Sequence, residues 1–306
     1  MRLSIITINY NNAEGLRKTL ASVAAQTYRD IEHVIIDGGS TDGSVDIIRE
    51  YEEQLHITHS TIHIQWISEK DNGIYNAMNK GIEIALGRRI VNSFNRSEQR
   101  EDKNKVLPDY IQILNSGDIL AAPDVTERMF TALSTLNIQH STENGAPILY
   151  GNMIKKDYAT GKIIGKSEEV EYSLRQYYSS TMNHDCCYIC RELFERCGLY
   201  DENLKIVSDW KWFLQVVGLG HVKPIYVDVD VTIFDASGIS EMNLELRNKE
   251  RRQVLVNLLP PAILKDYDAH AFEMEQMKRL RMHHLYGLVY FMERVLFKLE
   301  KWRILK

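Results

Sequence analysis

Short apolar runs alternate with helical periodicity through the first 120 residues. Four apolar runs of five or six residues predict buried strands, at 3–8, 33–37, 62–67 and 110–114. Between the runs, apolar residues recur three and four positions apart, as on one face of a helix. These residues are Leu16, Leu20 and Val23, then Val45, Ile48 and Tyr51, then Ile74, Met78, Gly81 and Ala85. The alternation predicts an α/β fold with a parallel sheet covered by helices on both faces.

The pattern is less regular after residue 120. Three further strands and two helices are predicted, at 148–154, 186–190 and 225–234 and from Arg191 and Asp209. No linker rich in Pro, Gly or Ser separates this half from the first, so we expect one domain over 1–250 and a helical extension over 251–306. Inside the domain, residues 88–108 are largely polar and predict an inserted loop, which is either a lid or a solvated surface loop.

The C-terminal segment combines an apolar stripe with basic charge. From Leu285 onwards, the stripe consists of Leu288, Met292, Val295, Leu299 and Trp302. Between residues 277 and 306 there are eight Lys or Arg and two Glu, a local balance of +6. A basic amphipathic helix of this kind suits an anionic membrane surface. The same stripe would equally serve packing on the protein's own domain, or on a second copy in a homo-oligomer.

Composition narrows the class of protein. The chain of 306 residues is 44% hydrophobic, as expected of a globular protein with a large core. Its formal charge of −5 argues against a nucleic-acid partner, because neutralising phosphates needs a concentrated excess of Lys and Arg. The first residues lack a secretory signal pattern and no window resembles a membrane span, so we expect a cytoplasmic protein. Its four cysteines lack the paired spacing of a zinc site and are interpreted as reduced, buried thiols.

A polar segment follows each of the first four predicted strands. In sheets of this kind, ligands bind beyond the carboxyl ends of the strands. We therefore expect four segments to converge on one cleft edge: residues 7–11, 37–44 (DGGSTDGS), 68–73 (SEKDNG) and 115–118 (NSGD).

Asp118 is the candidate metal ligand in NSGD. The small residues Ser116 and Gly117 before it leave room for a divalent cation and phosphate oxygens. Mg²⁺ or Mn²⁺ takes only one or two protein carboxylates when a nucleotide diphosphate fills other positions. The tetrapeptide also fits an ordinary turn, since Asn, Gly and Asp favour turn conformations.

The segment DGGSTDGS also has two interpretations. It fits a tight turn in which Asp42 or Ser44 caps the next helix. It also fits a nucleotide-binding loop in which Asp37 accepts hydrogen bonds from a base or ribose and the glycines admit close approach. The segment is neither G-x-G-x-x-G nor a phosphate loop, which disfavours a dinucleotide dehydrogenase or a P-loop enzyme.

Two candidates lie in the second half of the domain. Ser208 and Asp209 precede an apolar helical run, where Asp209 is either part of an N-cap pair or a general base held in a cleft. His184 precedes a strand-like run and is either a hydrogen-bonded structural residue or a site residue.

Six segments together resemble the family 2 glycosyltransferases of the GT-A fold, particularly bacterial enzymes of surface-polysaccharide assembly. In chain order they are SIITINYNNAEGLRKTLASVAAQTY, VIIDGGSTDGSVDII, SEKDNGIYNAMNKGI, YIQILNSGD, RELFERCGLYDENLKIVSDWKWFLQ and GISEMNLELRNKER. They cover most of residues 1–250, and their shared order is specific although each segment alone is weak. The resemblance implies a Rossmann-like, mixed, mainly parallel sheet flanked by helices.

The resemblance also implies roles for single residues. Thr7, Tyr10 and Asp37 would bind the nucleoside of a nucleotide-sugar, with the Tyr10 ring beside the uracil of a UDP-sugar. Asp71 and Lys80 lie in the stretch that lines the same pocket.

The remaining implied roles concern the diphosphate and the acceptor. Asp118 would hold Mn²⁺ or Mg²⁺ on the diphosphate, and Asp209 would be the catalytic base. Arg247 lies in the segment that closes over the diphosphate, where it would contact phosphate or form a surface ion pair.

These roles describe an inverting transfer of a sugar to a hydroxyl of a glycan or lipid-linked acceptor. The enzyme would work in the cytoplasm, at the inner face of the cell membrane if the C-terminal helix binds lipid. The alternative is a catalytically inactive nucleotide-sugar-binding or scaffold protein on the same fold.

Three positions depart from the family pattern. Ser116 stands where the D-x-D motif has its first Asp, so metal binding would rest on one carboxylate. Asn76 stands where relatives usually carry Asp, and the stretch 88–108 interrupts a link that is usually short.

Overall fold

The computed structural model describes residues 1–58, 60–91, 106–135, 147–157, 160–220, 222–235, 243–282 and 286–304. The expected polar loop at 88–108 lies mostly outside these residues, as does the start of the segment that by resemblance closes over the diphosphate. The chain forms two compact units, residues 1–251 and 252–306.

The first half of unit 1 is a parallel sheet. Its strands are β1 (Leu3–Asn9), β2 (Ile31–Asp37), β3 (His63–Ser68) and β4 (Tyr110–Ile113), in the spatial order β3-β2-β1-β4. Every residue of β1, β2 and β4 is buried, because helices cover both faces. The four strands predicted from the apolar runs are confirmed, with bounds shifted by one or two residues.

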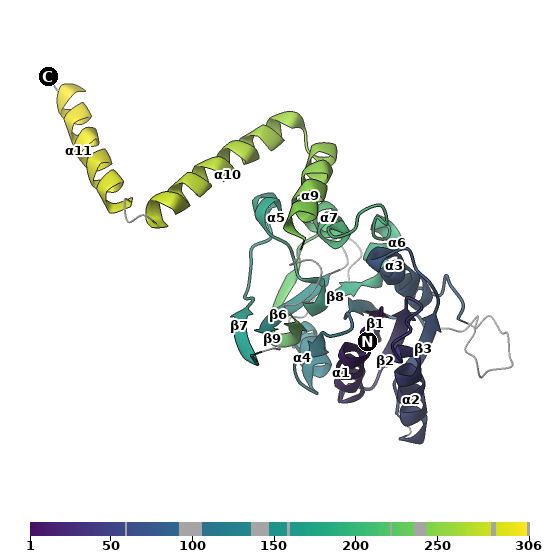
Figure 1. Ribbon diagram of the computed structural model, residues 1–306. Helices are drawn as coiled ribbons and strands as arrows, with labels where there is room; N and C mark the ends of the chain where they lie inside the picture. The colour runs from purple at the N-terminus through teal and green to yellow at the C-terminus, as the bar shows by residue number, and fades with distance from the viewer. Residues whose placement is uncertain are drawn as a thin grey trace. The chain divides into compact units, whose positions relative to one another are not determined.

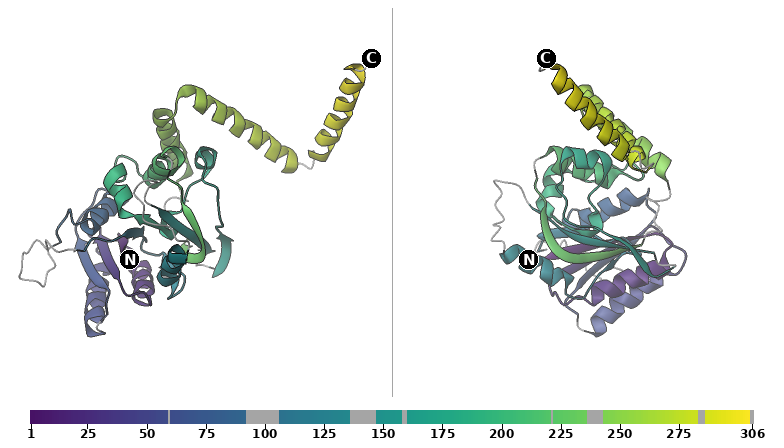
Figure 2. Two further views of the ribbon diagram at one scale, coloured as in Figure 1. Left: turned by 180° about the vertical axis from the view of Figure 1, so that it is seen from behind. Right: turned by 90° about the vertical axis from the view of Figure 1, so that its left-hand side faces the viewer.

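The helices between these strands form two layers. Figure 2 shows α1 (Ala13–Ala24) and α2 (Ser44–Ile57) on one face of the sheet and α3 (Ile74–Ala85) on the other. Their buried residues include most of the stripes predicted from helical spacing. The exceptions are the first residue of two stripes, since Val45 is half-buried and Ile74 is exposed. Helix α3 lies close to the sheet, because a Cβ atom added to Gly81 would be 2.3 Å from Cγ2 of Ile6 in β1.

The second half makes the sheet mixed. Strand β8 (Cys187–Cys190) runs antiparallel to both β4 and β6 (Ile148–Asp157). Strand β9 (Ile225–Asp235) is parallel to β6 and pairs with the two-residue strand β5 (Ile119–Leu120), while β7 (Lys162–Lys166) pairs with β6. The elements around these strands are α4 (Val125–Thr135), α5 (Leu174–Ser179), the 3₁₀ turn η1 (His184–Cys186), α6 (Arg191–Cys197), α7 (Ser208–Phe213) and the π-helix η2 (Leu214–Leu219).

Three helices follow, and α9 (Leu244–Leu258) crosses the boundary between the units (Figure 1). Unit 2 continues with α10 (Pro261–Met282) and α11 (Tyr286–Ile304). Large apolar side chains are exposed along α11: Leu288, Val289, Tyr290, Phe291, Met292, Val295, Leu296 and Phe297. None of the described helices is long and apolar enough to cross a membrane.

Candidate active site

The segments after β1, β2 and β3 meet around Gly38. A Cβ atom added there would lie 2.5 Å from Oδ2 of Asp71 and 3.1 Å from Cδ2 of Tyr10. The Tyr10 ring is 65% exposed, so its face is accessible to a ligand. The convergence expected for parallel strand ends therefore brings an exposed ring and a carboxylate together beside a residue without a side chain.

Asp37 builds the turn that carries Gly38. Its side chain is fully buried, and each carboxylate oxygen accepts two hydrogen bonds from the protein. Oδ1 accepts from Asn9 and the Ser40 hydroxyl, and Oδ2 accepts from the Ser40 backbone N–H and the Ser68 hydroxyl. A carboxylate has about four lone-pair positions, and these four donors fill them. A nucleoside contact would require one of these bonds to be exchanged.

Thr7 lies inside the sheet rather than on the cleft surface. It is fully buried, and its hydroxyl is 3.0 Å from Nε2 of His33, whose Nδ1 is 3.0 Å from the Tyr51 hydroxyl. Burial lowers the pKa of His33 to about 3, so the ring is neutral at pH 7. The Thr7 side chain belongs to this buried network, and its β1 position places only its backbone near the strand end.

Lys80 holds the segment that carries Asp71. Its ammonium forms a 2.7 Å ion pair with Glu69 and donates to the Lys70 carbonyl at 3.3 Å. The Lys80 side chain is only 10% exposed, whereas its partner Glu69 is 43% exposed and also pairs with Arg89. Oδ1 of Asp71 accepts a hydrogen bond from the Gly73 backbone at 2.9 Å, just before α3 begins. Lys80 thus orders the loop of the expected nucleotide pocket through Glu69.

The NSGD turn is fastened to helix α1. Nδ2 of Asn12, the N-cap of α1, donates to the Ser116 carbonyl at 3.0 Å. The Thr19 hydroxyl accepts from the Gly117 N–H at 3.0 Å and donates to the Asp118 carbonyl at 2.7 Å. Gly117 has a φ of 108°, a conformation that side chains disfavour. The turn therefore holds Asp118 in a fixed place at the cleft edge.

The donor atoms of this turn suit a hard divalent cation. The Asp118 carboxylate is buried, and Oδ1 of Asn115 is a buried oxygen that accepts no hydrogen bond. Oxygen ligands of these types are the ones that Mg²⁺ and Mn²⁺ prefer. Within the described part of the chain no three His, Cys, Asp or Glu side chains cluster as a metal site. A cation here would need most of its ligands from a diphosphate and water.

Asp209 lies at the start of α7 with both carboxylate oxygens hydrogen-bonded. Oδ1 accepts from the Tyr75 hydroxyl at 2.7 Å, and Oδ2 is 3.1 Å from Nδ1 of His184. Burial would raise the pKa of Asp209, but the hydrogen bonds and charge of His184 and the bond from Tyr75 hold it below the ordinary value. Asp209 is thus ionised at pH 7, as a general base must be, while 17% of its side chain remains exposed.

His184 connects the two candidate carboxylates. Its Nε2 is 3.2 Å from Nδ2 of Asn115, in the turn that carries Asp118. Burial would lower the pKa of His184, but the hydrogen bond and charge of Asp209, with the charges of Asp185 and Asp118, raise it above its ordinary value. His184 therefore contacts both Asp209 and the turn that carries Asp118, so the expected base and the expected metal ligand lie on neighbouring segments.

Two arginines on α9 complete this side of the site. The guanidinium of Arg251 lies 4.9 Å from the centre of the Trp210 ring, next to Asp209. Arg247 lies one turn earlier, and Nε of both arginines is buried without a hydrogen-bond partner. Burial, followed by the charge of Arg247, lowers the pKa of Arg251. Arg251 therefore lies near Asp209 with an unused donor at Nε, and Arg247, one turn along α9, has an unused Nε as well.

Sequence reasoning assigned no individual role to Tyr75, Asn115 or Arg251, although Asn115 lies in the NSGD segment expected at the cleft edge. Tyr75 is adjacent in sequence to the apolar stripe of α3. It resembles an ordinary core aromatic residue, from which only its hydroxyl group differs. Its partner Asp209 is 134 residues away. The pattern of a single segment contains no signal for such a pair.

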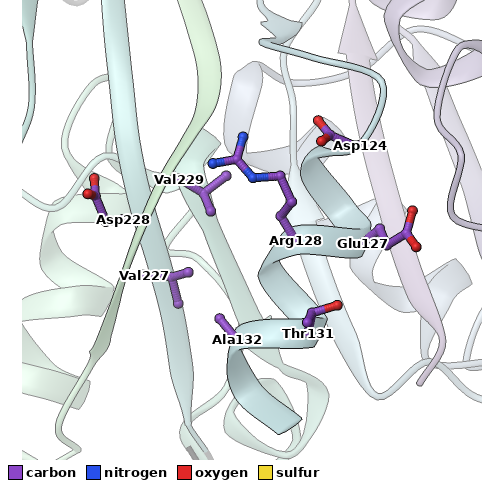
Figure 3. Close-up of a pocket in the computed structure, with 8 residues that line it drawn as sticks. All are labelled: Asp124, Glu127, Arg128, Thr131, Ala132, Val227, Asp228 and Val229. Carbon is purple, nitrogen blue, oxygen red and sulfur yellow. The ribbon is translucent and has the colours of Figure 1, made fainter. Parts of the chain in front are cut away.

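A further hollow lies away from these residues. It has a volume of about 530 Å³ between α4 and β9, and its lining includes Asp124, Arg128, Asp228 and Val229. Figure 3 shows the Arg128 side chain extending from α4 toward Val229. The lining contains none of the candidate site residues, so the hollow does not belong to the site.

Comparisons with known proteins agree with this fold. Residues 4–93 match the model of the family described as glycosyl transferase family 2. An uncharacterized glycosyltransferase of Mycobacterium tuberculosis is 28% identical over 242 residues, which cover 78% of this chain and 76% of the relative. A PGL/p-HBAD biosynthesis glycosyltransferase of Mycobacterium bovis is 25% identical over 235 residues, 77% of each chain.

Solved structures share the fold at low sequence identity. TarS of S. aureus matches with a TM-score of 0.58 and 16% identity, over 88% of this chain and 42% of TarS. The mannosyltransferase PcManGT of Pyrobaculum calidifontis, solved with GDP-Man and Mn²⁺, matches with a TM-score of 0.55 and 16% identity, over 89% and 69%. This chain therefore spans less than half of the TarS chain. The chain thus has the GT-A fold of these structures, and it is similar to glycosyltransferases of family 2 through residues 4–93 and through its curated relatives.

Proposed function

We propose that this glycosyltransferase is an inverting, metal-dependent enzyme that moves a sugar from a nucleotide-sugar, a UDP-sugar, to a hydroxyl of a glycan or lipid-linked acceptor in surface-polysaccharide biosynthesis. One observation carries the proposal. Asp209 is an ionised, partly exposed carboxylate, and His184 joins it to the turn that holds Asp118. A base and a metal ligand within one site are what a single-displacement transfer needs.

The nucleotide-sugar donor fits the edge formed by β1, β2 and β3. The exposed Tyr10 ring offers a stacking face for a base, and Gly38 leaves space between that ring and Asp71. Related folds support this choice, since structures of TarS with UDP-GlcNAc and of PcManGT with GDP-Man are known. These two names also favour a hexose or an N-acetylhexosamine as the transferred sugar.

Asp118, with the Asn115 amide oxygen, would hold Mn²⁺ or Mg²⁺. The cation would neutralise the diphosphate as it leaves. Both PcManGT and GalNAc-T7 were solved with Mn²⁺ and a nucleotide. The guanidinium groups of Arg247 and Arg251 would add positive charge near the diphosphate. Within the described residues, Nε of each side chain has no hydrogen-bond partner and could donate to a phosphate oxygen.

Asp209 would remove the proton from the acceptor hydroxyl as that oxygen attacks the anomeric carbon. The bond from that carbon to the diphosphate breaks in the same step, so the anomeric configuration inverts. No second carboxylate nucleophile is needed, unlike retaining glycoside hydrolysis. The lowered pKa of Asp209 keeps the base ionised through the neutral range.

The C-terminal segment supports the proposed acceptor class and location. The apolar side chains along α11 and the balance of +6 over residues 277–306 favour binding to an anionic membrane surface. An enzyme bound there from the cytoplasm would meet lipid-linked acceptors. Packing on a second copy of the chain is the other use of that surface.

Asp209→Asn tests the function directly. Release of UDP from a panel of UDP-hexoses, with water as the acceptor, should fall by about 10²- to 10⁴-fold, because the amide cannot take a proton. Calorimetric binding of UDP with Mn²⁺ should stay nearly unchanged. Asp46→Asn, which alters a surface ion pair on α2, is the matched control and should turn over normally. Undiminished turnover in Asp209→Asn would refute the base, and nucleotide binding without turnover in the unmodified protein would support a scaffold.

A further inference from the structure

Tyr75 links Asp209, the candidate base, to helix α3, which follows the loop of the expected nucleotide pocket. It is the second residue of α3, its side chain is buried, and its hydroxyl donates to Oδ1 of Asp209 at 2.7 Å. Burial and then the charge of Asp209 raise the pKa of this hydroxyl well above its ordinary value, so it stays protonated and acts only as a donor. Tyr75 therefore has no acid–base role of its own in the neutral range.

The two bonds to Asp209 fix how its carboxylate is oriented. Tyr75 uses one oxygen and His184 uses the other, so rotation of the carboxylate would break both bonds. Two of the roughly four lone-pair positions stay available for an incoming hydroxyl. Both bonds also reduce basicity, since they help to lower the pKa of Asp209. A site that needed only a strong base would not gain from them, whereas a site that needs a fixed direction of proton transfer would.

The position of Tyr75 in α3 fixes the Asp209 carboxylate relative to the strand ends where the donor would bind. The helix starts directly after the loop in which Asp71 faces Gly38 and Tyr10. Its interior is fixed against β1 by the close approach of Gly81 to Ile6. The Tyr75 hydroxyl is therefore held in a set relation to the strand ends where the donor would bind.

We propose that Tyr75 is a positioning residue that sets the carboxylate of Asp209 in register with the nucleotide-sugar. The inference rests on the proposed function, because it takes Asp209 as the base. It goes beyond that function by giving α3 a part in the chemical step.

The chain offers a matched control in Tyr200. Its ring lies 5.8 Å from that of Tyr75, its side chain is also buried, and it also senses the charge of Asp209. The Tyr200 hydroxyl, however, is buried and has no hydrogen-bond partner. Tyr75→Phe and Tyr200→Phe thus remove the same atom from the same aromatic cluster, and only the first removes a bond to the base.

The experiment compares kcat and KM for UDP release from a UDP-hexose in the full chain and both variants. Rates are normalised to the fraction of protein that binds UDP in calorimetry, so any loss of folded protein cancels. Tyr75→Phe should lower kcat by about 10- to 100-fold, the effect of losing one hydrogen bond to a charged group, with donor KM nearly unchanged. Tyr200→Phe should keep kcat at the level of the unmodified protein.

Equal kcat values in the two variants would overturn the positioning role. So would a rise in donor KM with unchanged kcat in Tyr75→Phe, which would make Tyr75 a binding residue. Asp209→Asn, measured alongside, separates the two proposals. If it still turns over, the base assignment itself fails; if it is inactive while Tyr75→Phe matches Tyr200→Phe, only the positioning inference fails.

Discussion

The side-chain amide of Asn76 forms two hydrogen bonds beside the candidate site. Its Nδ2 donates to Oε2 of Glu202 at 2.9 Å, and its Oδ1 accepts from the Asn72 backbone at 3.2 Å. Asn79, one turn later, donates to the other oxygen of Glu202. The family resemblance leads one to expect Asp at position 76, but here a donor is needed opposite Glu202. The departure from the family pattern thus has a local cause in hydrogen bonding.

Asn76→Asp should therefore destabilise the protein. The change replaces a hydrogen bond by two facing carboxylates, and we expect a loss of about 0.5–1.5 kcal/mol in the free energy of unfolding. Urea unfolding at pH 7 measures it. The double variant Asn76→Asp with Glu202→Gln restores a donor and should recover most of the loss. A double variant less stable than Asn76→Asp alone would show that the pair does not interact as described.

Single residues were only partly predictable from sequence. Asp118, Asp209 and His184 were named as candidates, but each had an equally ordinary reading as a turn, a cap or a structural histidine. The contacts that bring these residues together join His184 to Asp209, 25 positions away, and to Asn115, 69 positions away, so no local pattern could predict them. Thr7 and Asp37 were expected to bind a nucleoside, and their burial depends on partners from neighbouring strands.

At the scale of elements, hydrophobic periodicity predicted the long, buried strands and the helices between them. Strands β1, β2 and β4 are covered on both faces, so their apolar runs are unbroken and easily recognised. Strand β5 has only two residues, which is too short to show a hydrophobic pattern. Among the described strands β7 pairs only with β6, and its Ile163 and Ile164 are exposed. These strands, together with β8, make the sheet mixed, a feature that only the family resemblance had indicated.

Helix α3 supplies a test at this scale. A Cβ atom on Gly81 would lie 2.3 Å from Ile6 and 3.4 Å from Ile36, both core residues of the sheet. Gly81→Ala should cost about 1–3 kcal/mol by overpacking, which exceeds the gain of about 0.5–1 kcal/mol in helix propensity. Thermal unfolding measures the change. Gly287→Ala in α11, where a Cβ atom meets nothing within 4 Å, should show no loss. Unchanged stability in Gly81→Ala would mean that α3 is not held so closely.

At the scale of the whole molecule, charge is unevenly distributed. The chain carries −5 overall, whereas residues 277–306 carry +6, which leaves −11 for the rest. The rest of the chain should be repelled by an anionic membrane, and the C-terminal segment should be attracted to it. The proposed membrane attachment therefore depends on this segment alone.

Removing the residues after Met277 tests that dependence. The full chain should sediment with phosphatidylglycerol vesicles at low salt and dissociate as salt rises, because each basic residue contributes about 1 kcal/mol near such a surface. The truncated chain should stay in the supernatant, and neither should bind phosphatidylcholine vesicles. Equal sedimentation of both chains would contradict the attachment. Loss of a dimer on truncation, without vesicle binding by the full chain, would assign the helix to subunit contact.

The central claim is that a donor diphosphate binds through a cation held by Asp118, while Asp209 acts only in the chemical step. Calorimetric titration of UDP with Mn²⁺, and again with EDTA, tests it most directly. We predict binding that disappears with EDTA and in Asp118→Ala, and that persists in Asp209→Asn. UDP binding that is the same with Mn²⁺ and EDTA, or unchanged in Asp118→Ala, would contradict the claim.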